Sequence, residues 1–232
     1  MIDITITPDE IVLLELGSIE LTATVVFAWL VMAILLVLTW AVARNLTTGR
    51  TLSRRQNMLE SVVSIMRSQI RELTGQDPER YLPFIGSLFL FVSVSNLLDV
   101  VPGYHPPTAS INTTAALALL VFLAVPVYGI AERGFLGYMK KYIQPTPLML
   151  PFNIISEFSR TVALAVRLFG NIMSGGLIVA VLVALVPLLV PVTMEIFGLL
   201  IGQIQAYIFA VLSTVYIGAG ARRRRQTAAG RA

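Results

Sequence analysis

The stretch PFNIISEFSRTVALAVRLFGNIMSGGLIVAVLVALVP, residues 151–187, decides the fold class of this chain. Proline is favoured at the first position of a helix, and no further proline interrupts the pattern between Pro151 and Pro187. At 1.5 Å per residue such a helix is roughly 50 Å long, whereas the hydrocarbon core of a bilayer is about 30 Å thick. A helix this long and this apolar must therefore tilt strongly or kink within a membrane.

The rest of the chain is equally apolar. Of its 232 residues 56% are hydrophobic and only 13% are charged, with a mean hydropathy of +0.80, so lipid rather than water must cover it. We predict an all-α integral membrane protein with a single membrane domain, residues 1–232. Five helices are expected to cross the membrane: 21–43, 81–101, 114–130, 151–187 and 192–221, the second and third forming a hairpin, and the last two forming a long, strongly tilted one.

One predicted helix, residues 52–75, differs from these spans. Its apolar residues, among them Met58, Val62 and Ile65, recur at helical spacing, while basic residues occupy the other positions. Such an amphipathic helix is expected to lie in the membrane interface rather than to cross the bilayer.

The basic residues predict the orientation. Of the 17 basic residues, seven lie between Arg44 and Arg80, three lie between residues 131 and 147, and five lie in the tail at 222–232. Lysine and arginine favour the cytoplasmic side, so these regions are expected to face the cytoplasm. The N-terminus and the loop VPGYHPPTASIN, residues 101–112, then face outward.

Only Arg160 and Arg167 lie outside these three basic regions. Arg160 is about two turns into the helix that begins at Pro151, so its long side chain can reach the interface. Arg167 is two turns deeper, where a guanidinium costs a few kcal/mol even on the most lenient insertion scales. Because such residues face a partner or a hydrated cavity, we expect Arg167 to be functional.

Polar residues follow Arg167 along one helical face. Arg160, Arg167, Asn171 and Ser174 recur at intervals of three to seven residues. On the last helix Glu195, Gly198, Gly202, Gln205 and Ser213 also fall on one side, and the small residues there allow a close helix contact. Two polar stripes on consecutive helices predict a hydrated path. The alternative is that Asn171 and Gln205 only bond each other.

Signatures of other function classes are not found in the sequence. It has no phosphate-binding loop, dinucleotide fingerprint, nucleophile elbow or metal-ligand cluster, so no catalytic, cofactor or metal residues are predicted. The basic residues lie in loops between apolar runs, which argues against nucleic-acid binding despite a pI near 9.7. His105 is expected to be structural.

Three segments of the chain carry a resemblance to a known family. RLFGN at residues 167–171, IQAYIF at 204–209, and NLLDVVPGY at 96–104 with PTASINTT at 107–114 closely resemble subunit a of F-type ATP synthases. The resemblance covers about residues 59–221. It implies a non-catalytic stator subunit of the bacterial inner membrane, whose partners are a rotor ring of c subunits and the peripheral stalk b subunits.

The resemblance also implies a mechanism. Arg167 would face a carboxylate on each passing rotor subunit, favour its ionised form, and block ions from leaking straight across. Two offset half-channels would carry H⁺ or Na⁺, with Asn171 and Gln205 near the arginine and along the channel.

The chain departs from the family at three positions. Gly176 and Gly198 stand where many relatives have titratable residues, and Ser110 stands where an aspartate is common. We hypothesise that Glu195, one turn before Gly198, replaces the lost ionisable group. In its lack of these titratable residues the chain also resembles alternative bacterial F-type ATPases suspected of moving Na⁺. This ion needs oxygen ligands rather than a relay of titratable side chains.

Two other functions compete with the rotary interpretation. A stand-alone transporter or channel would use Arg167 to bind an anionic substrate. A scaffold subunit would hold Arg167 in a permanent salt bridge. Apart from Glu195, the sequence offers no carboxylate near the depth of Arg167, which favours a partner from another chain.

Overall fold

The computed structural model describes residues 9, 12–16, 19–101, 103–143, 148–185 and 190–221, apart from residues 45–53. Their order is a β-hairpin, a first helix, a helix at the bundle end, and four further helices, with short 3₁₀ turns before α3 and between α3 and α4. The bounds are β1 Val12–Leu16, β2 Ile19–Thr22, α1 Ala23–Arg44, α2 Arg54–Thr74, α3 Leu82–Leu97, α4 Ile111–Ile143, α5 Met149–Leu185 and α6 Val190–Ala221, with 3₁₀ turns at Pro78–Arg80, Leu98–Val100 and Pro107–Ala109.

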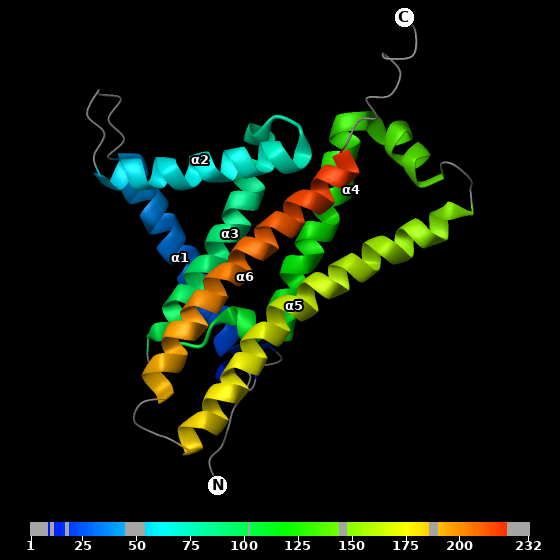
Figure 1. The fold of residues 1–232 in the computed structure, drawn as a ribbon. Coiled ribbons are helices and arrows are strands. Elements are labelled where there is room, and N and C mark those ends of the chain that lie inside the picture. The colour runs from blue at the N-terminus through cyan, green and yellow to red at the C-terminus, as the bar shows by residue number, and fades with distance from the viewer. Residues whose placement is uncertain are drawn as a thin grey trace, which may run out of the picture.

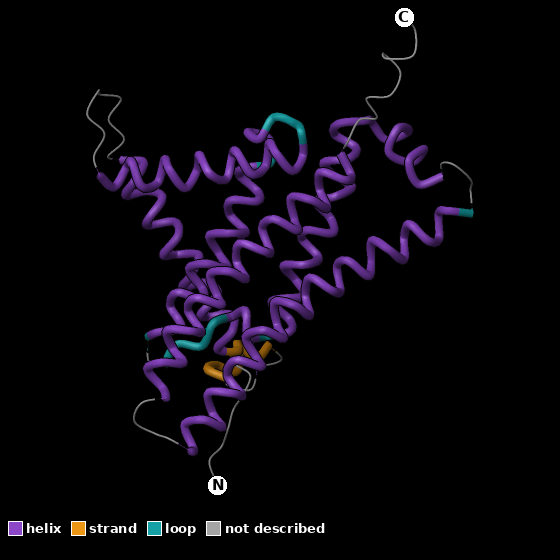
Figure 2. The backbone as a smooth tube through the Cα atoms, viewed as in Figure 1, coloured by secondary structure: helices purple, strands orange, loops and turns teal. Residues whose placement is uncertain are grey.

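Five of these helices, α1 and α3 to α6, are long and apolar enough to cross a membrane, which confirms the predicted fold class. Figure 1 shows α5 and α6 both running obliquely between the two ends of the molecule. The sequence did not predict the hairpin of β1 and β2, which pair antiparallel. Figure 2 shows these strands at the end of the bundle where the loop at residues 101–110 also lies, the loop side.

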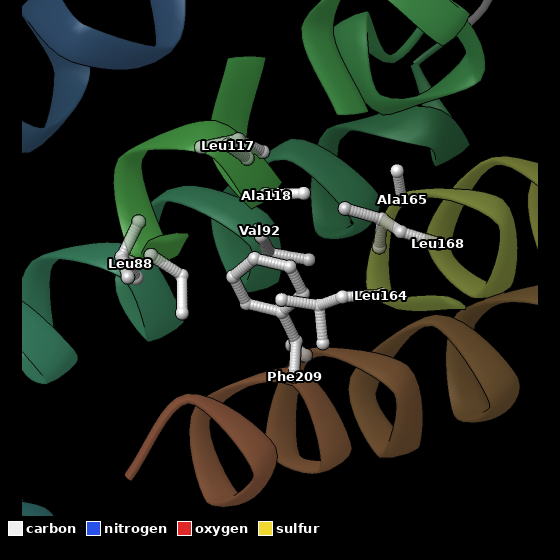
Figure 3. Packing of buried hydrophobic residues seen from close by; sticks show 10 residues of the cluster. Leu88, Val92, Leu117, Ala118, Leu164, Ala165, Leu168 and Phe209 are labelled. Atoms are coloured by element: carbon white, nitrogen blue, oxygen red, sulfur yellow. The ribbon is translucent and has the colours of Figure 1, made fainter. Parts of the chain in front are cut away.

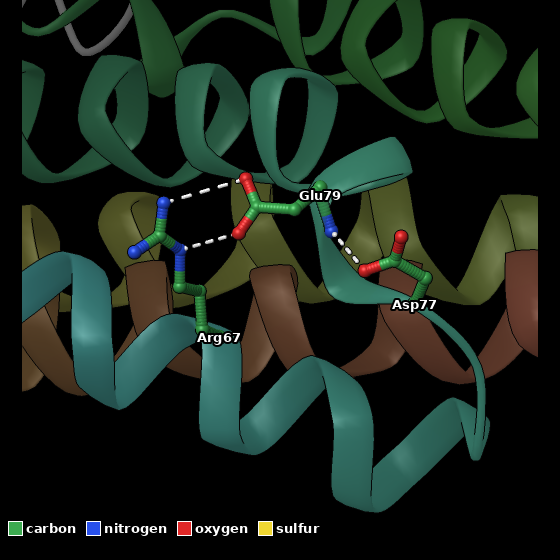
Figure 4. A network of polar contacts seen from close by, with 3 residues as sticks. All are labelled: Arg67, Asp77 and Glu79. Atoms are coloured by element: carbon green, nitrogen blue, oxygen red, sulfur yellow. Dashed lines mark hydrogen bonds and ion pairs between the residues drawn. The ribbon is translucent and has the colours of Figure 1, made fainter.

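Helix α2 lies across the opposite end of the molecule, the α2 side (Figure 1). Polar contacts just after it fix its end. Arg67 Nε lies 2.7 Å from Glu79 Oε1, and Asp77 caps the next 3₁₀ turn by accepting from the backbone N–H of Glu79 (Figure 4). Arg80 pairs with Glu132 of α4. The buried Ile70 of α2 packs against the bundle, whereas Val62 and Ile65 are exposed, as an interfacial helix requires.

Helix α4 is longer than the span expected at 114–130. Residues 135–143 form a further helical segment within the basic region, after a kink at Gly134, whose φ is +73°. A positive φ favours glycine, and the non-helical backbone at Gly134 interrupts the helix and redirects it. Its last turns therefore run beside the α2 side of the molecule (Figure 1).

The core lies where α3, α4, α5 and α6 meet. Phe209 of α6 fits among side chains from the other three helices, as Figure 3 shows. The buried residues of this cluster are Leu88 and Val92 of α3, Leu117, Ala118 and Val121 of α4, Leu164, Ala165 and Leu168 of α5, and Ala206 and Phe209 of α6.

Candidate functional site around Arg167

Arg167 borders the part of α5 that packs into the core. Leu164 and Leu168 are buried, at 2% and 0% exposure, whereas Arg167 between them is exposed on the surface of the chain. A helix turns 100° per residue, so Arg167 lies beside the buried face, and Asn171 and Ser174 continue its side of the helix. Asn171 is half-buried and Ser174 is exposed. The predicted polar stripe of α5 therefore faces the outer surface of the chain.

The guanidinium of Arg167 has no ion pair or hydrogen bond with any residue that the structure describes. The two salt bridges found there, Arg67–Glu79 and Arg80–Glu132, both lie at the α2 side. Arg160, two turns earlier, differs because its guanidinium lies 5.7 Å from the ring centre of Tyr216 on α6, a cation–π contact. Both arginines of α5 are exposed, but only Arg160 contacts a side chain of another described helix through its guanidinium.

Glu195 is not the internal partner of Arg167. It lies about one and a half turns into α6, near the loop side, whereas Arg167 is about 18 residues, or about 27 Å, from the end of α5 at that side. Glu195 is exposed, and its charge interacts with that of Asp99, which in turn interacts with His105. Glu195, the only carboxylate that the sequence suggested as a partner for Arg167, therefore interacts with charged residues at the loop side instead.

The polar stripe of α6 changes character along its length. Glu195 and Gly198 are exposed, but Gly202, Gln205 and Ser213 are buried. A Cβ on Gly202 would lie 2.9 Å from the Cβ of Asn96, which explains why a glycine is needed at this contact between α3 and α6. No hydrogen bond joins the side chains of Asn171 and Gln205 in the described part of α5 and α6, so the alternative that they only bond each other is not supported.

Buried polar residues that the sequence analysis missed connect α3 to α6. Asn96 donates to the backbone carbonyl of Gly202 at 2.9 Å and accepts from Thr108 at 3.1 Å. Ser93 donates to Gln203 at 2.5 Å, and Gln203 donates back to the Ser93 carbonyl at 3.0 Å. Asn96 and Gly202 are far apart in the chain. Spacing within one helix does not reveal a contact between such distant residues, so the sequence alone did not indicate it.

A second polar cluster joins the N-terminal region to the start of α4. The carboxylate of Asp9 accepts from Thr24 and Ser110 at 2.6 Å and from Asn112 at 3.3 Å. Ser110 also caps α4 by accepting from the backbone N–H of Asn112. Ser110 was noted as a departure from the aspartate of relatives, yet a carboxylate, that of Asp9, lies against it in this fold.

Tyr104 packs in the same region of the loop side. Its ring contacts Phe27 of α1 edge-on at 5.0 Å, and its hydroxyl lies 3.5 Å from that of Ser95. Burial raises the pKa of Tyr104 to about 12, which the negative charge of Asp99 reinforces. This phenol therefore stays neutral and belongs to the packing of the loop side.

The surfaces of α5 after Arg167 and of α6 near Glu195 carry glycines with open space around them. A Cβ on Gly170, Gly175 or Gly176 of α5, or on Gly198 of α6, would meet nothing within 4 Å. Small residues on an apolar helix surface let the backbone of a neighbouring helix approach closely. An unpaired cation beside such a surface can attract a negative charge carried by another membrane helix. No three His, Asp or Glu side chains of the described ranges are placed to hold a metal ion.

Comparison with known proteins adds to this geometry. The family model described as ATP synthase A chain matches residues 25–218. ATP synthase subunit a 1 of Chlorobaculum parvum is 54% identical over 96% of this chain and 98% of its own length. ATP synthase subunit a 2 of a Picosynechococcus species is 56% identical over 93% of each. ATP synthase subunit a of Albidiferax ferrireducens is 52% identical over 95% of each.

Proposed function

The chain belongs to the ATP synthase A chain family, the membrane-embedded and non-catalytic subunit a, and from this premise we propose that Arg167 is its ion-translocating charge. In this role the exposed face of α5 and α6 lies against the rotor ring of c subunits, and the peripheral stalk b subunits hold the chain still. The observation that supports the proposal best is the exposed guanidinium with no partner among the described residues.

The physical argument rests on the cost of an unpaired charge. A guanidinium near mid-membrane costs a few kcal/mol even on lenient scales, and one partner for it is a carboxylate of a neighbouring chain. Attraction to Arg167 lowers the pKa of that carboxylate, so the ion carried on it is released beside the arginine. The fixed positive charge then prevents a cation from passing straight across the membrane.

Two half-channels complete the mechanism. Glu195, whose charge acts on that of Asp99 at the loop side, serves the outer path in place of the titratable residues absent at Gly176 and Gly198. Asn171, Ser174 and Gln205 line the route near Arg167. The transported ion is H⁺ or Na⁺, and each charge gains about 2.3 kcal/mol per 100 mV of membrane potential.

The charges favour one orientation. Arg67, Arg71 and Arg80 lie at the α2 side, so this side faces the cytoplasm of a bacterial inner membrane and the loop side faces outward. The N-terminus is then outside. The C-terminal arginines at 222–225, which lie outside the described residues, follow α6 on the cytoplasmic side.

Replacing Arg167 tests the proposal directly. In the complete complex reconstituted into liposomes, Arg167→Gln should lower ATP-driven ion flux by at least about 100-fold, because the electrostatic partner of the rotor carboxylate is lost. Fluorescence quenching would report H⁺ uptake and a radioactive tracer Na⁺ uptake. In the same assay Glu195→Gln should lower the flux by about tenfold or more if it is the outer titratable group.

Arg160→Gln is the matched control, because Arg160 lies on the same helix but is paired with Tyr216. It should retain most of the flux and leave assembly intact. Normal flux in the Arg167 variant would contradict the proposal. Ion flux by this chain alone in liposomes, without any partner subunit, would instead favour a stand-alone transporter.

A further inference from the structure

A cavity lies between α4 and α5, on the α2 side and away from the polar stripe. Its volume is about 320 Å³. It is formed because α4 bends at Gly134, so that the last turns of α4 and the first turns of α5 diverge (Figure 1). The lining is Phe122, Pro126, Tyr138 and Met139 of α4 with Leu150, Ile154 and Glu157 of α5, so one carboxylate lies in an otherwise largely apolar wall.

These lining residues fall within the membrane-spanning segments Ile111–Lys140 and Met149–Val179. An apolar cavity at this depth faces hydrocarbon rather than water, and leaving it empty would forfeit the contacts of every residue that lines it. The apolar face of α5 continues outside the cavity, where Ile155 and Phe158 are 61% and 63% exposed. Acyl chains therefore surround this part of the helix.

We propose that the cavity between α4 and α5 holds one acyl chain of a phospholipid from the adjacent leaflet. An otherwise apolar cavity that opens on the lipid-facing surface suits a single acyl chain. A cavity of about 150 Å³ takes benzene, so this one has room for a chain of about a dozen carbons.

The charges orient the lipid. The sequence order places Tyr138, Met139 and Leu150 at the mouth, next to the exposed Lys140, and places Phe122 and Glu157 at the deep end. A phosphate at the mouth is attracted by the ammonium of Lys140, whereas a phosphate at the deep end would meet the carboxylate of Glu157. The acyl tail therefore points inward and an anionic headgroup stays at the membrane interface.

The proposal rests on membrane embedding alone and not on the role of Arg167. The test uses the complete complex in vesicles of phosphatidylethanolamine and phosphatidylglycerol, the latter carrying a diazirine in its acyl chain. After irradiation, mass spectrometry should find the lipid on the peptide that contains Leu150 and Ile154, more often than on the peptide of α1 around Leu36, which is 71% exposed but lines no cavity. Equal labelling of both peptides would overturn the proposal.

Neighbouring residues give a matched pair of variants. Ile154→Trp fills the cavity, whereas Ile155→Trp adds the same side chain on the adjacent exposed position. Labelling should fall at least threefold in the first variant and remain unchanged in the second. Lys140→Gln, which alters no lining residue, should lower the labelling by phosphatidylglycerol relative to a phosphatidylethanolamine probe. Equal labelling in the two tryptophan variants, or crosslinking of a photoreactive residue at 154 to another subunit instead of lipid, would refute the proposal.

Discussion

Helices α5 and α6 carry polar residues at similar spacing, but these residues are mostly exposed on α5 and mostly buried on α6. On α6, Gly202, Gln205 and Ser213 are buried inside the chain, and Asn96 of α3 bonds the backbone there. On α5, Arg167 and Ser174 are exposed, and Arg167 has no partner in the described part of the chain. The contact of Asn96 with the Gly202 backbone holds α3 and α6 together, whereas the exposed polar residues of α5 are available to another molecule. Periodicity alone does not separate the two cases.

The largest effect is expected from a side chain at the contact between α3 and α6. Gly202→Val would place a Cβ 2.9 Å from Asn96 Cβ and displace the Asn96 hydrogen bond. Overpacking and the lost bond together should cost about 2–4 kcal/mol of stability. Denaturant unfolding of the purified chain in detergent would measure this loss.

Gly198→Val is the matched control on the same helix, because a Cβ at Gly198 meets nothing within 4 Å. Its unfolding free energy should match that of the wild type within about 0.5 kcal/mol. Similar losses in both variants would remove the distinction between the buried and the exposed parts of α6.

The fold class was predictable because lipid imposes a strict length and polarity rule on spanning helices. Helix ends were less predictable. The basic residues Arg133 and Lys140 follow the expected end of the span at residue 130, yet the helix resumes after the kink at Gly134 and continues to Ile143. Charge marks the membrane boundary, not the end of a helix, since a helix can continue into the interface.

The candidate site was predictable only in part. A cation in an apolar run is visible in any sequence, so Arg167 could be singled out without a structure. Its exposure and the distance to Glu195 depend on how α5 packs against α4 and α6, which spacing within one helix does not determine. The contact of Asp9 with Ser110 joins residues far apart in the chain, and no local pattern encodes it.

A smaller effect on stability is expected from two asparagines, Asn96 in the buried contact of α3 with α6 and Asn171 on α5. Asn96→Ala would leave the Thr108 hydroxyl and the Gly202 carbonyl without their buried partner, at a cost of about 1–3 kcal/mol. Asn171→Ala should change stability by less than about 0.5 kcal/mol, because that side chain is not part of the packed interior. Ion flux should respond in the opposite way, with the loss of Asn171 reducing it. A destabilised Asn171 variant would show that α5 also uses its polar residues internally.

The smallest effect concerns Tyr104, which extends the internally packed polar region to the loop side. Its pKa is raised to about 12 by burial, from about 10 in an unfolded chain. Below pH 10 both states hold the proton, so stability does not depend on this group. As pH rises from 10 to about 12, the unfolded state releases the proton while the folded state retains it, and stability falls by about 1.4 kcal/mol per pH unit.

Tyr104→Phe removes this proton and keeps the ring contact with Phe27. The melting temperature in detergent should therefore fall less steeply in the variant than in the wild type between pH 10 and 11.5, with little difference at pH 8. Tyr207, which is exposed at 46% and bonds Gln69, is the control, and its replacement by phenylalanine should leave the alkaline slope unchanged. Equal slopes for all three proteins would mean that water reaches Tyr104, and the loop side would then belong with the open surface of α5 rather than with the closed interior of α6.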